Sequence, residues 1–175
     1  VLENIRELRN FTTSFYRISS SKLQDLQETK RVLFLSDLHN HSYGRENERL
    51  LAKIKELHPE MILIGGDMLI RKDGNSYEGT VRFLSELPKI CPVYYANGNH
   101  EQKLKELPQK YEQSYEVYKS SLTDAGIHFL ENESVVFEWD GIKIAVTGLE
   151  IPLYGYRHFG TVSLQESVLK ELIGE

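Results

Sequence analysis

Short hydrophobic runs along the chain alternate with stretches in which apolar residues recur every three or four positions. The runs have the length of buried β-strands, and the recurring positions are typical of one face of an α-helix. In the first hundred residues this pattern predicts strands at 11–18, 30–36, from Met61, and at 92–96. It predicts helices at 47–57, which Pro59 ends, and through Val81, Leu84 and Leu87, which Pro88 closes. The repeated strand–helix order favours a largely parallel sheet covered by helices.

The second half of the chain predicts further strands and two more helices. Pro108 fits the first turn of a helix with apolar positions from Tyr111 to Ala125, and Gly126 ends it. Strands are expected at 127–130, 134–139 and 143–147, with Asp140-Gly141 as the turn of a hairpin. A capping box at Ser163-x-x-Glu166 opens a last helix that runs through Leu172. We therefore expect an α/β fold whose sheets become mixed, in a single domain over residues 1–175.

Size and charge narrow the functional classes. A chain of 175 residues can bury one core, and its net charge of −5 argues against a surface that binds nucleic-acid backbones. A phosphate substrate stays compatible with this charge, because a bound metal ion can supply positive charge locally. No run reaches the ~18 apolar residues that a membrane span needs. Cys91, the only cysteine, is interpreted as an inert buried thiol.

Polar side chains follow three of the predicted strands at the points where those strands end. Asp37 and His39 follow the first strong strand, Asp67 follows the second, and Asn99 with His100 follows the third. The carboxyl ends of neighbouring parallel strands lie at one edge of an open sheet, where ligands bind. Carboxylate, amide and imidazole ligands that converge there suit a divalent metal ion.

These residues resemble the first three motifs of the calcineurin-like metallophosphoesterase family. The matching segments are Asp37-Leu38-His39, Gly66-Asp67 and Gly98-Asn99-His100-Glu101, and the resemblance extends over about residues 11–149. The residues around Asp37 and those from Leu130 to Glu133 are most similar to a subgroup that is often exported or membrane-tethered. The resemblance implies a four-layer α-β-β-α sandwich with mixed sheets, and a hydrolase of phosphoester bonds that uses two metal ions.

The family resemblance also implies a role for each residue. Asp37 and His39 would bind one ion, Asp67 would bridge both, and Asn99 would bind the second; the ions would be Mn, Fe or Zn. A metal-bound hydroxide would attack phosphorus. His100 would stabilise charge on the phosphate or protonate the leaving oxygen. The substrate would be a phosphorylated small molecule or a lipid-linked compound, with phosphodiesterase or pyrophosphatase chemistry.

The chain departs from the family pattern after its third motif. The family adds a later histidine and then Gly-His-x-His, whereas His158 is the only histidine here after His128. We therefore expect the chain to be the N-terminal portion of a longer enzyme, C-terminally truncated, slow or inactive alone, and with apolar edges exposed. Membrane association would then come through a segment that this sequence does not contain.

Two other functions compete with catalysis. The first is a catalytically inactive scaffold of the same fold that binds a partner. The second is nucleotide binding by a Rossmann-like sheet, which is weakly supported because Gly-x-Gly-x-x-Gly and the phosphate-binding Gly-Lys-Ser/Thr are both absent.

Several further residues carry open alternatives. Gly66 and Gly98 either let the backbone turn tightly beside the metals or are ordinary loop glycines. Glu101 is expected to orient a metal ligand, and His41 is expected on the loop surface. The segment 154–160, with Arg157, is interpreted as an ordinary surface loop, with the substrate entrance as the alternative.

Overall fold

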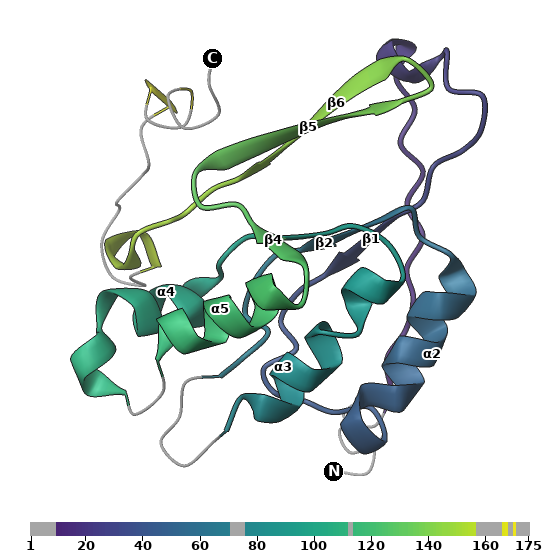
Figure 1. The fold of residues 1–175 in the computed structure, drawn as a ribbon. Coiled ribbons are helices and arrows are strands. Elements are labelled where there is room, and N and C mark those ends of the chain that lie inside the picture. The colour runs from purple at the N-terminus through teal and green to yellow at the C-terminus, as the bar shows by residue number, and fades with distance from the viewer. Residues whose placement is uncertain (1–9, 71–75, 112–113, 157–165, 168–169, 171–175) are drawn as a thin grey trace.

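The computed structural model describes residues 10–70, 76–111, 114–156, 166–167 and 170. Its centre is a four-stranded parallel sheet in the order β1-β2-β3-β4, with helices packed on one face and a two-stranded antiparallel hairpin lying across the other (Figure 1). The strands are β1 (Val32–Leu35), β2 (Met61–Ile64), β3 (Val93–Tyr95), β4 (Ile127–Phe129), β5 (Glu133–Trp139) and β6 (Ile142–Gly148). The helices are α2 (Glu48–Leu57), α3 (Glu78–Leu84), α4 (Asn99–Glu106) and α5 (Tyr115–Asp124), with short 3-10 helices at Ser21–Leu23, Arg45–Asn47, Leu87–Lys89, Pro108–Lys110 and Leu153–Tyr156.

The parallel sheet separates a buried face from a partly exposed one. Ile62, Val93 and Ile127 point toward the helices and are at most 1% exposed, because successive strand residues alternate between faces. The strand register places Phe34, Leu63, Tyr94 and His128 in one row on the opposite face. Phe34, in that row, is 65% exposed. The core of the described residues therefore lies between the sheet and the helices.

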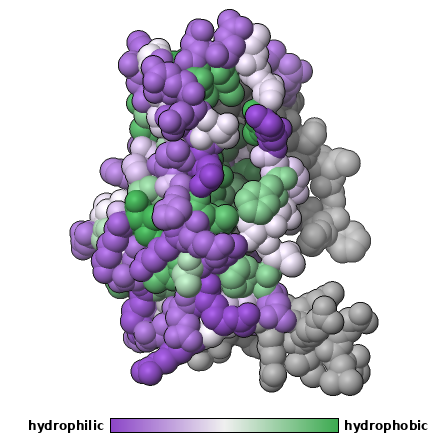
Figure 2. Space-filling view, turned by 90° about the vertical axis from the view of Figure 1, so that its right-hand side faces the viewer, coloured by the Kyte–Doolittle hydropathy of each residue, from purple (hydrophilic) through white to green (hydrophobic). Residues whose placement is uncertain are grey.

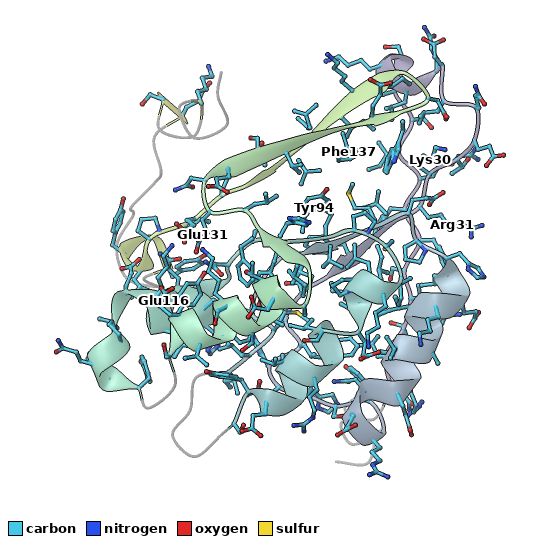
Figure 3. The ribbon with its side chains drawn as sticks, viewed as in Figure 1. Lys30, Arg31, Tyr94, Glu116, Glu131 and Phe137 are labelled. Atoms are coloured by element: carbon cyan, nitrogen blue, oxygen red, sulfur yellow. The ribbon has the colours of Figure 1, made fainter. Side chains whose placement is uncertain are left out.

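The hairpin presents an apolar face to this second side of the sheet. Asp140 and Gly141 both have positive φ, which is the backbone conformation of a tight hairpin turn. Three cross-strand pairs on one face of the hairpin are apolar: Val135 with Val146, Phe137 with Ile144, and Trp139 with Ile142. Figure 3 shows Phe137 and Tyr94 in the space between the hairpin and the sheet. Figure 2 shows hydrophobic residues gathered in a hollow on one side of the molecule, between more hydrophilic parts above and below.

The α/β class with a parallel sheet is confirmed, and the described residues supply three of the four expected layers. These are the helices, the parallel sheet and the hairpin of a second sheet. None of the helices in the described part is long and apolar enough to cross a membrane.

Two predicted elements differ from the structure, and one observed helix was not predicted. Residues 11–18 form no strand, because no neighbouring strand in the described part pairs with them, and Tyr16 is 89% exposed. The helix predicted from Pro108 begins at Tyr115, because Ser114 is its N-cap and accepts a hydrogen bond from the Val117 amide. Helix α4 was not predicted, because its only large apolar residue, Leu104, gives no helical period. The helix predicted from Ser163 falls mostly outside the described residues.

Candidate metal centre

The loops after β1, β2 and β3 meet at one edge of the parallel sheet, as the sequence predicts. Backbone hydrogen bonds continue between the first two loops beyond the ends of the strands. The Asp37 N–H donates to the Gly66 carbonyl over 3.1 Å, and the His39 N–H donates to the Asp67 carbonyl over 3.0 Å. These bonds fix the first motif against the second.

Three side chains at this edge are spaced to bind a divalent ion. His39, Asp67 and His100 each offer a ligand atom, and these atoms lie within 4.8 Å of one another. Ligands lie roughly 2.0–2.2 Å from a bound ion such as Zn²⁺, so two ligands of one ion lie at most about 4.4 Å apart. The observed spacing fits one ion after a small closing movement. His39 is exposed, and solvent therefore reaches the cluster.

Asp37 borders this cluster without belonging to it. Its Oδ1 lies 3.7 Å from His39 Nε2, and its side chain is 66% exposed. Its other carboxylate oxygen accepts a hydrogen bond from the Ser36 hydroxyl. Asp37 can therefore reach an ion beside His39 by a side-chain rotation, and its role as a ligand stays a prediction.

Asn99 lies against Asp67 with its amide nitrogen, not its oxygen, turned inward. Asn99 Nδ2 donates to Asp67 Oδ2 over 2.9 Å, and Lys103 Nζ donates to Asn99 Oδ1 over 3.0 Å. For Asp67 and Asn99 to bind the same ion, the side-chain amide of Asn99 must rotate by half a turn, because only its oxygen can be a metal ligand. The His100 backbone N–H donates to Asp67 Oδ1 over 2.8 Å, which holds the third motif to the same carboxylate.

The backbone is strained at the residues that carry the motifs. Asp37, His39 and Asp67 have φ values of 57°, 52° and 54°, in the left-handed region. This conformation costs a non-glycine residue roughly 1–2 kcal/mol, and such strain concentrates at functional sites. The backbone hydrogen bonds between the two loops hold it in place.

The second and third motifs touch through two glycines. Gly66 has φ +82°, and a Cβ there would lie 2.0 Å from the Gly98 nitrogen. A Cβ on Gly98 would lie 2.5 Å from Asp67 Oδ1. Both positions therefore need glycine because the two loops approach so closely, which favours the tight-turn alternative over ordinary loop glycines.

Glu101 ties these two loops together from inside the protein. Its side chain is fully buried, and its carboxylate accepts hydrogen bonds from the N–H groups of Asp67 (2.9 Å), Met68 (3.0 Å) and Gly98 (3.1 Å). Burial raises the pKa of Glu101, and the hydrogen bonds that it accepts oppose that rise. The expected orienting role of Glu101 has a direct structural basis in these bonds.

A second polar network lies beside α4 and α5. Glu131 pairs with Lys105 at 3.0 Å and with Lys119, and it also accepts from the Tyr115 hydroxyl (Figure 3). Burial raises the pKa of Glu131, but the hydrogen bonds from Lys119, Tyr115 and Lys105 outweigh it and lower that pKa to about 2. This network fixes the segment between β4 and β5 to the helices behind the metal centre.

Sequence reasoning missed Lys103. Lys103 lies four residues after Asn99 on one face of α4, so recognition of that helix would have revealed it. In the segment 154–160, the pKa of Tyr156 is raised by burial and then by the charges of Asp67, Glu101 and Glu150. His41 stays apart from the cluster and packs on Tyr43, with ring centroids 4.6 Å apart. Arg157 and His158 lie outside the described residues.

Comparison with known proteins matches the chain to one family and to two relatives. Residues 30–169 match the model of the family described as calcineurin-like phosphoesterase. In Bacillus subtilis (strain 168), the uncharacterized protein YpbG is 25% identical over 148 residues (81% of this chain, 47% of YpbG). The uncharacterized metallophosphoesterase YkoQ of the same strain is 30% identical over 122 residues (68% of this chain, 42% of YkoQ).

A solved structure shares the fold. The crystal structure of phosphopantetheinyl hydrolase (PptH) from Mycobacterium tuberculosis superposes with a TM-score of 0.51 at 17% identity, and the match covers 81% of this chain and 50% of PptH. At that identity the likeness concerns the fold alone. The chain spans about half the length of the relatives that it matches.

Proposed function

Because this chain belongs to the calcineurin-like phosphoesterase family, we propose that the protein hydrolyses phosphoester bonds at a dinuclear metal centre built on the first three strand ends. The observation that carries the proposal is the convergence of His39, Asp67 and His100, whose ligand atoms lie within 4.8 Å of one another. His39 and Asp67 come from two separate loops and His100 from the first turn of α4, and hydrogen bonds from the His39 and His100 backbone N–H groups to Asp67 hold them together.

The residues divide between two ion positions. Asp37 and His39 would hold one ion, Asp67 would stand between the two, and Asn99 would hold the second after its amide turns over. Oxygen and imidazole donors of this kind suit Mn, Fe or Zn. Two such ions supply Lewis acidity to the phosphate group and make water a nucleophile near neutral pH. The protein's own contribution is to hold the carboxylates and imidazoles at fixed distances.

His100 has two uses in this proposal. Its backbone is fixed by the hydrogen bond to Asp67, and its ring packs against that of His39 with centroids 5.0 Å apart. An imidazole at this place can neutralise charge on the phosphate or give a proton to the leaving oxygen, because its ordinary pKa is near neutrality. The same ring can also bind the ion that His39 and Asp67 share.

Charge and exposure support one substrate class. A net charge of −5 disfavours long nucleic acids, whereas a cluster that solvent reaches at His39 is compatible with a small phosphodiester or pyrophosphate. We therefore propose a phosphorylated small molecule or a lipid-linked substrate, with phosphodiesterase or pyrophosphatase chemistry. The name of the solved neighbour, phosphopantetheinyl hydrolase, is compatible with a small substrate of this kind.

Mn²⁺ binding and turnover of bis-p-nitrophenyl phosphate test the proposal together. Isothermal titration of the chain with Mn²⁺ should show binding that Asp67→Asn weakens at least ~10-fold, because it removes the carboxylate expected to bridge the ions. Asp124→Asn, at the exposed end of α5, changes charge equally and should leave binding unchanged. Absence of Mn²⁺ binding, or equal binding by both variants, would contradict the proposal.

The scaffold alternative predicts a different result for a change at His100. His100→Ala separates the two functions. An enzyme loses turnover and keeps its melting temperature, whereas a scaffold that binds a partner keeps that binding without change.

A further inference from the structure

Two buried tyrosine hydroxyls lie behind the carboxylate that joins the metal loops. Tyr95 is the last residue of β3 and Tyr118 lies on α5, and both are fully buried. The Tyr95 hydroxyl donates to Glu101 Oε1 over 2.7 Å, and it lies 2.9 Å from the Tyr118 hydroxyl. The hydroxyls therefore form a continuous line from α5 to the loops that carry Asp67 and Gly98.

The direction of these hydrogen bonds follows from counting protons. Each hydroxyl has one proton, and the Tyr95 hydroxyl donates its proton to Glu101 Oε1. Since Tyr95 gives its proton to Glu101, Tyr118 must donate to Tyr95. Burial and then the Glu101 charge hold the pKa of both tyrosines well above its ordinary value, so both protons stay in place.

Four hydrogen bonds, two to each oxygen, fix the orientation of the Glu101 carboxylate. Oε2 accepts from the Asp67 and Gly98 amides, and Oε1 accepts from Met68 and Tyr95. Loss of the Tyr95 hydroxyl would leave Oε1 with the Met68 amide alone. The carboxylate could then rotate, and the two loops that it joins would separate more easily.

We propose that Tyr95 and Tyr118 are positioning residues for the metal centre, which act through Glu101 to hold the Asp67 loop against the Gly98 loop. The link to metal binding rests on the proposed function above. The link to the loops does not, because it concerns hydrogen bonds that are present without an ion. A partner that orients a metal ligand typically affects metal affinity ~10–100-fold when it is removed.

The first test follows the amide protons directly by hydrogen exchange in NMR. In Tyr95→Phe, exchange of the Asp67, Met68 and Gly98 amides should be ~10-fold faster or more, with a smaller increase in Tyr118→Phe. Ile127→Val is the matched control, because it removes one buried methyl group from β4, beside β3. If it lowers the melting temperature as much as Tyr95→Phe does and speeds these amides equally, the proposal is overturned.

The second test measures Mn²⁺ affinity on the same proteins. Tyr95→Phe should weaken binding by ~10-fold and Tyr118→Phe by a few-fold, about 3, whereas Ile127→Val should have no effect. Because Tyr118 acts through Tyr95, the double variant should bind Mn²⁺ like Tyr95→Phe alone.

The two tests separate the two proposals. If amide exchange is faster in Tyr95→Phe but the wild-type protein binds no Mn²⁺, the role of the tyrosines in holding the loops is supported and the metal centre is rejected. Normal Mn²⁺ binding by both tyrosine variants, with unchanged amide exchange, would reject the positioning role and leave the metal centre intact.

Discussion

A methyl group on Gly66 should destabilise the protein far more than the same change at a glycine of the same conformation elsewhere. Gly66 and Gly141 have φ values of +82° and +84°, so alanine at either position should cost about 1–2 kcal/mol in backbone strain. A Cβ on Gly141 meets nothing within 4 Å, whereas a Cβ on Gly66 would lie 2.0 Å from the Gly98 nitrogen. The loops must therefore move apart in Gly66→Ala and not in Gly141→Ala.

That movement reaches the hydrogen bonds to Glu101. Relief of the overlap to 3.0 Å needs a shift of about 1 Å, which would break a bond such as that from the Gly98 amide, now 3.1 Å long. A hydrogen bond to a charged group contributes ~1.5–3 kcal/mol. We therefore expect Gly66→Ala to lose about 2.5–5 kcal/mol of the free energy of unfolding, against about 1–2 for Gly141→Ala.

Urea unfolding followed by circular dichroism measures both variants, and equal m-values would show that the comparison is valid. A difference between the two of less than about 0.5 kcal/mol, the usual scatter of independent surface effects, would show that the loops are not in contact.

Three further predictions concern charges and a thiol. Because the pKa of Glu131 is lowered to about 2, its contribution to stability is complete above its unfolded pKa of about 4.3 and is lost as pH falls toward 2. Glu131→Gln should therefore destabilise the protein at pH 6 and be nearly neutral at pH 2, and a pH-independent difference in unfolding free energy would refute the ion network. Lys103→Met removes a positive charge next to Asn99 and should strengthen Mn²⁺ binding ~5–30-fold, because roughly 1–2 kcal/mol of repulsion in a water-like dielectric is lost. Lys110→Met, on the exposed 3-10 helix Pro108–Lys110, is its control. Equal Mn²⁺ affinities of the two variants would contradict the contact between Lys103 and Asn99. Burial, and then the charge of Glu60, raises the pKa of Cys91 to about 11. Iodoacetamide at pH 8 should therefore alkylate Cys91 ~100-fold more slowly than it alkylates glutathione. Comparable alkylation rates would be inconsistent with a protonated thiol.

The order of strands and helices along the chain, and the meeting of the motifs at one edge of the sheet, could be predicted because each depends on local sequence. Each motif directly follows a hydrophobic run, and parallel strands bring their carboxyl ends to one edge. The hairpin turn at Asp140-Gly141 was equally readable, since few residue pairs allow positive φ at both positions. These features need no knowledge of distant contacts.

The remaining features depend on contacts between distant segments. The apolar residues of helix α4 do not recur at helical spacing. The reason is that Asn99, His100 and Glu101 bond to the loops of the candidate metal centre rather than pack in the hydrophobic core. Residues 11–18 alternate like a strand, but alternation cannot show whether a neighbouring strand is present to pair with them. The close approach of Gly66 to Gly98 and the burial of Glu101 arise only when two loops pack together.

Anomalous diffraction from crystals of the protein grown with Mn²⁺ would test the central claim most directly. We expect one peak among His39, Asp67 and His100, and a second between Asp67 and Asn99 with the Asn99 amide oxygen turned toward it. Diffraction from these crystals without a peak at this edge of the sheet, or with peaks only elsewhere, would contradict the metal centre.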